Sequence, residues 1–187
     1  MAARFYEMAY EFEPSSDILR LLLAEKYIEL GKYPQALLTI RRGREIDRLG
    51  EREKDMLAKV YMKMGQFAKA ADVLELLERK DDEDVYSLGL LYESLGEPDK
   101  AIAAYLEFLE RRPASQRVAL KTAGLMLREK RYEQVDSLLR EVENRFGPSA
   151  QLHHFVGVLA LAAGDTAVAL QRFGEAIEQD STHEDAL

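Results

Sequence analysis

Small and large apolar residues follow one another at a spacing that repeats about every 34 residues along the chain. The small residue recurs at intervals of 34, 31, 34 and 34 residues, at Ala24, Ala58, Gly89, Ala123 and Gly157. Three positions later stands a large residue in most copies, at Tyr27, Tyr61, Tyr92 and Met126, with Ala160 in the last copy. Residues three apart share one face of an α-helix, and the small one leaves room for a neighbouring helix. The pattern predicts a first helix in each copy.

A turn and a second helix follow in each copy. Small-to-large pairs four residues apart begin at Ala36, Ala70, Ala101, Val135 and Ala169. The turns before them carry Gly31, Gly65, Gly96 and Gly164, and in the fourth copy Lys130 replaces the glycine. Because only glycine takes positive φ without strain, the same turn would cost about 1 kcal/mol at Lys130.

These recurring small, aromatic, glycine and alanine positions resemble the tetratricopeptide repeat family, whose unit is a 34-residue helix–turn–helix. The resemblance covers essentially the whole chain. It implies an all-α fold: a right-handed α-solenoid, or superhelix, of antiparallel helix–turn–helix units, in which the first helices line a concave groove. It also implies that the tyrosines at repeat positions pack between helices rather than bind a ligand.

The repeats divide the chain as one solenoid domain over residues 1–187. Residues 1–16 form the second helix of a partial repeat, and residues 184–187 begin a truncated one. The full repeats are expected at residues 17–50, 51–81, 82–115, 116–149 and 150–183.

Three local features modify this plan. The 31-residue interval predicts that the second helix of the 51–81 repeat ends early, near residues 78–84. Gly43 is expected inside a helix, at a cost of about 1 kcal/mol. Ser181 and Glu184 have capping-box spacing, which predicts a new helix start there. The preceding helix would then leave Phe173 and Ile177 uncovered, which favours a fragment of a longer protein, an end covered by a partner, or self-association through the terminal helices.

Composition narrows the function classes. The 187 residues are 47% hydrophobic and 32% charged, as expected of a folded soluble protein, and the net charge of −8 disfavours nucleic-acid partners. The absence of cysteine removes disulfides and thiolate sites but leaves the redox compartment open. The longest apolar run, FVGVLALAA from Phe155, is about half a membrane span, and no signal peptide is evident. We expect no membrane insertion and a cytoplasmic location.

Catalytic and metal chemistry have no visible place in the sequence. No nucleophile elbow, phosphate loop, dinucleotide-binding turn or zinc-binding helix motif occurs. His153 and His154 are adjacent, so on a helix they point about 100° apart and do not chelate one ion by themselves. We therefore expect no enzyme activity, no cofactor and no metal.

The groove implied by the resemblance supplies the candidate partner-binding residues. Arg117, Lys121 and Arg128 have no acidic groove neighbour in their own helix, which suits a carboxylate or phosphorylated segment, although an ordinary solvated face is the alternative. Asp55 is expected to pair with Lys59, four residues later. The full candidate set is Leu22, Glu25, Met56, Lys59, Met62, Lys63, Tyr86, Leu90, Arg117, Lys121, Arg128, His154 and Phe155.

These observations predict a non-enzymatic scaffold that binds a peptide segment or a partner surface in the concave groove. One alternative is a regulatory or substrate-docking region of a larger enzyme whose catalytic domain lies outside this chain. Another is recognition of RNA by a solenoid, which requires a segregated basic face and steep salt dependence.

Overall fold

The computed structural model describes residues 2–184, and the side chains within residues 4–180. Over the described residues the chain contains eleven α-helices, one 3₁₀ helix and no strand. The chain divides into two compact units, Met1–Gly96 and Glu97–Leu187. The α-helices are α1 (Ala2–Phe12), α2 (Asp17–Glu29), α3 (Tyr33–Arg41), α4 (Glu51–Lys63), α5 (Phe67–Glu75), α6 (Asp82–Leu95), α7 (Pro98–Arg111), α8 (Gln116–Arg128), α9 (Tyr132–Phe146), α10 (Ala150–Ala162) and α11 (Thr166–Glu184).

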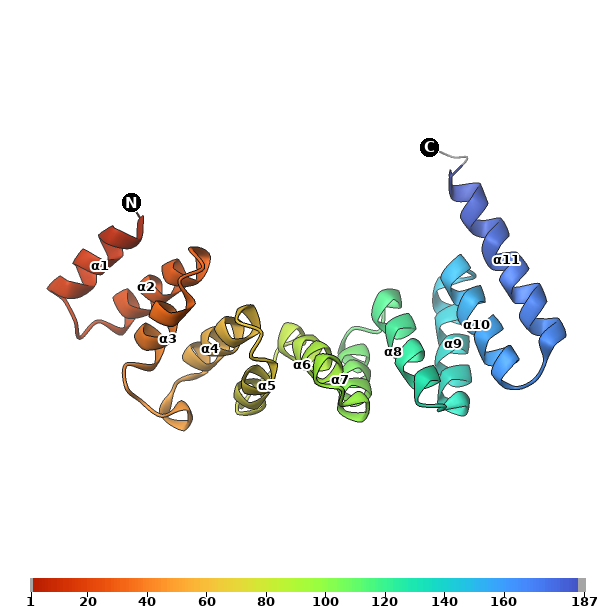
Figure 1. Ribbon diagram of the computed structural model, residues 1–187, viewed down its shortest axis with the longest axis horizontal. Coiled ribbons are helices and arrows are strands. Elements are labelled where there is room, and N and C mark those ends of the chain that lie inside the picture. Colours follow the sequence, from red (N-terminus) through yellow and green to blue (C-terminus); the bar gives the residue numbers. More distant parts are fainter. Residues whose placement is uncertain (1, 185–187) are drawn as a thin grey trace. The chain divides into compact units, whose positions relative to one another are not determined.

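In the first unit, each helix packs against the next one along the chain (Figure 1). Ala24 of α2 and Ala58 of α4 are completely buried, and Tyr61, one turn after Ala58, is 6% exposed. Helix α1 packs on α2, where the Tyr27 hydroxyl donates a hydrogen bond to Glu7 at 2.8 Å. The small-then-large pattern therefore forms the core, as the sequence predicts, and α1 packs on α2.

The second unit repeats this packing from α7 to α11 (Figure 1). Tyr105 of α7 and Ala123 of α8 are completely buried. Helix α10 approaches α11 at Gly157, where an added Cβ would lie 2.6 Å from Cε1 of Phe173. Glycine at this position is required by the close approach of the aromatic ring, not by the backbone conformation. The expectation that Phe173 is uncovered therefore holds only in part, because its ring is half-buried.

The turns between paired helices share one backbone conformation. At Gly65, φ is +70°, its N–H donates to the Met62 carbonyl at 3.1 Å, and the next N–H reaches the Tyr61 carbonyl at 2.9 Å. Lys130 takes the same conformation at φ +57°, with equivalent bonds to Leu127 at 3.0 Å and from Arg131 to Met126 at 2.9 Å. The predicted strained turn at Lys130 is confirmed.

Two of the second helices are short. Helix α5 has 9 residues, against 14 in α7 and 15 in α9, so the early end predicted from the 31-residue interval is confirmed, but the helix ends at Glu75, before the predicted residues 78–84. Helix α3 also has 9 residues and ends at Arg41. The expectation that Gly43 lies inside a helix is wrong, because Arg42 and Gly43 both take positive φ, 45° and 74°, and terminate α3.

The expected helix start at Ser181 is also wrong. Helix α11 is continuous for 19 residues, from Thr166 to Glu184. No glycine or proline follows Gly174, so nothing in the sequence ends the helix before Ser181. Because α11 does not end there, the capping-box spacing of Ser181 and Glu184 does not start a new helix. Of the expected truncated repeat, residues 185–187 lie outside the described residues.

The division into five full repeats remains a prediction. Helices α2 and α3, α4 and α5, α8 and α9, and α10 and α11 match the expected pairs. The boundary between the two compact units falls after Gly96, inside the expected 82–115 repeat.

Candidate partner-binding surfaces

The first helices of the first unit, α2, α4 and α6, carry eight of the candidate residues expected from the sequence. Glu25, Lys59, Lys63 and Leu90 are exposed, whereas Leu22, Met62 and Tyr86 are half-buried. Met56 is only 4% exposed. The expectation that Met56 faces a groove is therefore wrong: one position before the buried Leu57, it belongs to the core side of α4.

Ion pairs cross this surface. Arg52 of α4 donates to Glu25 of α2 at 3.2 Å, which links two adjacent first helices. Lys59 donates to Asp55 at 2.9 Å, so the predicted pair is confirmed. Burial lowers the pKa of Lys59, but the hydrogen bond and charge of Asp55 outweigh it and leave the pKa raised. The surface presents paired charges rather than a basic patch.

An acidic residue lies next to that pair. Burial raises the pKa of Asp84, at the start of α6, and the negative charges of Asp81 and Asp55 raise it further, against the hydrogen bond from the Asp81 backbone and the charge of Lys59. Asp84 also belongs to the capping box of α6, in which it accepts from the Asp81 N–H at 2.9 Å.

The second unit holds the remaining candidates on α8 and α10. Lys121 is half-buried, with its Nζ 5.8 Å from the centre of the Tyr105 ring, in cation–π geometry. Phe155 of α10 is half-buried and packs over Gly124 of α8, where an added Cβ would lie 3.3 Å from the ring. His154 is exposed, and its ring is 5.8 Å from that of Phe155. The structure thus places an aromatic ring between adjacent first helices.

Arg117 and Arg128 are exposed at the two ends of α8. Neither of them, nor Lys121, is a free charge, because each interacts with another part of the chain. Although these cations have no acidic groove neighbour on their own helix, they are therefore not an unpaired cationic cluster.

A buried ion cluster near the start of the chain escaped the sequence analysis. Arg20 of α2 is 1% exposed and donates to the Ile40 carbonyl at the end of α3 at 2.7 Å. It also pairs with Glu53 of α4, which is bonded in addition to Arg44 and to the Gly50 N–H. The position of Arg20 could have predicted its burial, because it lies four residues before Ala24 and therefore on the core-facing side of α2.

This cluster fixes the charge of its central carboxylate. Burial raises the pKa of Glu53, but the bonds from the Gly50 N–H, Arg20 and Arg44 lower it by more, so the pKa is below its usual value. The cluster joins the ends of three helices, and we assign it to stability rather than to binding.

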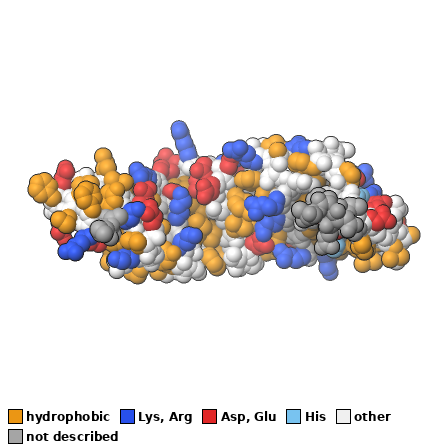
Figure 2. All heavy atoms as spheres, turned by 90° about the horizontal axis from the view of Figure 1, so that it is seen from above, with side chains coloured by type: hydrophobic (Ala, Val, Ile, Leu, Met, Phe, Trp, Pro, Cys, Tyr) orange, Lys and Arg blue, Asp and Glu red, His pale blue; other side chains and the backbone are white. Residues whose placement is uncertain are grey.

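Exposed apolar faces occur on two helices. On α1, Phe5, Met8 and Phe12 are 69%, 63% and 94% exposed, and Figure 2 shows hydrophobic side chains gathered at this end of the first unit. On α11, Leu170 and Ile177 are 68% and 70% exposed, so the expectation that Ile177 is uncovered is confirmed.

Within the described residues, no group of three or more histidine or acidic side chains is arranged to hold a metal ion. No helix in the described part of the chain combines the length and apolarity required to cross a membrane. Neither finding bears on segments outside the described residues.

Comparison with known proteins gives one family. Residues 56–115 and 86–134 match a tetratricopeptide repeat model. A stretch of 82 residues, 43% of this chain, is 37% identical to the signal recognition particle receptor FtsY of Aquifex aeolicus (strain VF5). That match covers only 16% of the length of the receptor.

Solved structures give the same fold. YrrB, described as a tetratricopeptide repeat protein with an unusual peptide-binding site, aligns with a TM-score of 0.76 at 17% identity, over 99% of this chain and 100% of its own. MamA from AMB-1 aligns with a TM-score of 0.73 at 19% identity, over 89% of this chain and 94% of its own. The fold is an α-solenoid, and tetratricopeptide repeat proteins are typically non-enzymatic protein-interaction scaffolds. Over residues 56–134 the chain is similar to the tetratricopeptide repeat family, and its fold matches solved structures of that kind.

Proposed function

We propose that the chain is a non-enzymatic scaffold that binds a peptide segment or a partner surface in a groove formed by its first helices. The packing of Phe155 against Gly124 between α8 and α10 carries this proposal. Lys121 and Arg128 lie on the same helix as Gly124, three residues before it and four residues after it, and so share its face of α8. Recognition of a peptide needs such an apolar contact, which supplies binding energy, next to charges that select the partner.

An acidic or phosphorylated segment fits the surface of α8 and α10 best. The Nζ of Lys121 lies 5.8 Å from the centre of the Tyr105 ring, and this cation–π contact favours one position of the ammonium group before a partner arrives. Because Arg117, Lys121 and Arg128 already have partners within the chain, an incoming carboxylate must share or displace them. We expect the charges to govern selectivity and salt dependence, and Phe155 to supply most of the affinity.

The surface of α2, α4 and α6 has a different character. Its charges form pairs such as Arg52 with Glu25, and its apolar groups include Leu22 and Leu90. A partner that binds here would place apolar side chains against these leucines, with the charges at the margin.

A pull-down with charge-reversed variants tests the proposal. Lys121→Glu combined with Arg128→Glu, and separately Leu22→Asp, should release partners that the wild-type chain retains. The matched control combines Arg48→Glu with Arg140→Glu, which reverses two exposed cations outside the first helices. If both test variants retain every partner, binding on the first helices is excluded.

A second proposal is that these repeats regulate or dock substrates for a catalytic domain in the same polypeptide. The match to a short part of a much longer receptor, 16% of its length, supports a modular role of this kind. The transcript that contains this chain decides between the proposals: a catalytic domain encoded in frame supports the second, and stop codons close to both ends contradict it.

Three further expectations remain predictions: a cytoplasmic location, no nucleic-acid partner, and self-association through the terminal helices. The exposed apolar faces of α1 and α11 support the last of these. Light scattering over a concentration series should show a rising mass that Phe12→Ser or Ile177→Ser reduces. Cell fractionation tests the cytoplasmic location. Filter binding of RNA at low salt tests whether the chain binds nucleic acid.

A further inference from the structure

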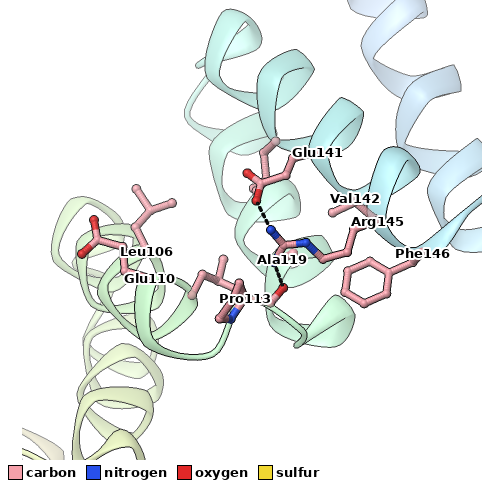
Figure 3. Close-up of a pocket in the computed structure, with 10 residues that line it drawn as sticks. Leu106, Glu110, Pro113, Ala119, Glu141, Val142, Arg145 and Phe146 are labelled. Carbon is pink, nitrogen blue, oxygen red and sulfur yellow. Dashed lines mark hydrogen bonds and ion pairs between the residues drawn. The ribbon is translucent and has the colours of Figure 1, made fainter.

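A cleft of 310 Å³ opens on the second-helix side of the second unit (Figure 3). Its walls are the later turns of α7 and α9, and its floor includes Ala119 of α8 and Pro113. This volume is at the lower end of the range of about 300–1,000 Å³ found for ligand pockets. The cleft is distinct from the first-helix surfaces, since only Ala119 belongs to a first helix.

The lining of the cleft is mostly apolar. Leu106 and Leu109 come from α7, and Leu138, Val142 and Phe146 come from α9. Leu106 is 36% exposed, so it is partly open to solvent, whereas Val142 is 2% exposed and forms part of the core beneath. A cleft with this lining can take up one large apolar side chain and bury it from water.

One wall is fixed in place by an arginine. Arg145 donates to the Pro113 carbonyl at 2.5 Å and to the Glu141 carboxylate at 3.1 Å, and Figure 3 shows it bridging these two groups. These bonds tie α9 to the segment between α7 and α8. They also use the positive charge of the cleft, which is therefore unavailable to attract an anionic ligand.

The charge that remains at the rim is negative. Glu110 lies on the α7 side of the cleft and Glu141 on the α9 side. Glu141 is paired with Arg145, whereas Glu110 forms no ion pair with any described residue. A ligand that fills the cleft therefore meets an unpaired carboxylate next to an apolar wall, which favours a cation beside an apolar group.

From this geometry we infer that the cleft between α7 and α9 binds a basic segment of a protein partner, which inserts one large apolar side chain and pairs a lysine or arginine with Glu110. The partner required here has the opposite charge from the acidic segment proposed for α8 and α10. The chain would therefore bind two different segments, one on its first helices and one on its second helices.

Selection of peptides on the full chain tests this inference. A phage-displayed library of random 15-residue peptides is selected on the wild-type chain, and the recovered peptides are measured by fluorescence anisotropy. We expect a class of peptides with a Leu, Phe or Met next to Lys or Arg. For this class, Leu106→Asn and Glu110→Lys should each weaken binding at least tenfold, while Lys121→Glu with Arg128→Glu leaves it unchanged.

Matched substitutions outside the cleft complete the experiment. Leu38→Asn replaces a leucine that is 76% exposed on α3, and Glu133→Lys reverses an exposed carboxylate on α9. Both should leave binding of the basic peptides unchanged, and circular dichroism confirms that all variants are folded. Two results would overturn the inference. One is that the selection recovers no peptides that combine a basic and a large apolar residue. The other is that the recovered peptides bind Leu106→Asn and Glu110→Lys as tightly as they bind the wild-type chain. The first-helix proposal is unaffected by either result.

Discussion

Replacing Lys130 by glycine should stabilise the second unit. Lys130 has φ +57°, where the four other repeat turns carry glycine at φ +69° to +82°. A non-glycine residue in the left-handed region costs about 1–2 kcal/mol. Glycine removes this cost, but it also makes the unfolded chain more flexible, which lowers the free energy of unfolding by about 0.4–1 kcal/mol. The net expectation is a gain of about 0.5–1 kcal/mol.

Urea unfolding followed by circular dichroism measures this effect. With a slope of about 1–3 kcal/mol per molar urea, the midpoint should rise by about 0.2–1 M at unchanged slope. Lys130→Ala is the matched control, since it removes the side chain but keeps the backbone strain. No hydrogen bond or ion pair joins the Lys130 side chain to another described residue, so this variant should be close to neutral.

The reverse substitution checks the same reasoning in the first unit. Gly65 has φ +70°, and no atom lies within 4 Å of an added Cβ. Alanine at this position therefore makes no steric clash, and Gly65→Ala changes stability only through the cost of a positive φ. It should destabilise by about 0.5–1 kcal/mol. If Lys130→Gly is no more stable than Lys130→Ala while Gly65→Ala is destabilised, backbone strain at Lys130 is refuted.

Three other substitutions test the packing. Glu53→Gln should cost about 3 kcal/mol, because it removes the carboxylate that pairs with both the buried Arg20 and the half-buried Arg44. Because the pKa of Glu53 is lowered in the folded chain, this stabilisation is present above pH 4.5 and is lost as the pH falls further, so acid unfolding of the variant should depend less on pH. Gly157→Ala should cost about 1–3 kcal/mol in thermal unfolding, because the new methyl group collides with Phe173. Burial and the neighbouring Glu7 raise the pKa of Tyr27 to about 12. Absorbance at 295 nm should therefore show one tyrosine that ionises at unusually high pH, and Tyr27→Phe should remove it. The free energy of unfolding should fall above pH 10, because this tyrosine ionises in the unfolded chain before it does so in the folded chain. An unaltered titration curve in that variant would contradict the assignment.

The sequence predicts the fold well because its information is periodic. Ala24 and Ala58 are completely buried where the repeat places small residues, and the turn at Lys130 could be located from the other copies alone. Where the repeat breaks down, prediction failed: neither the left-handed residues that end α3 nor the continuity of α11 through Ser181 follows from a repeat register.

The candidate surfaces were harder to predict, because exposure depends on side-chain direction within a helix face. Met56 is expected from the sequence to face the groove, but it is buried, as is the next residue, Leu57, on the core side of α4. The cleft beside Phe146 depends on how two second helices diverge, and its fixed wall depends on Arg145 reaching the Pro113 carbonyl across 32 positions of sequence. Neither relation has a short-range pattern in the chain.

Photo-crosslinking from single positions tests most directly whether partners bind on the first helices. Benzoylphenylalanine is placed at Lys121 on α8 or, as a control, at Glu133 on α9, and the chain is irradiated in cells. The proposed function predicts a discrete adduct from position 121 that is absent from position 133. Equal adducts from both positions, or an adduct from position 133 alone, would contradict binding on the first helices.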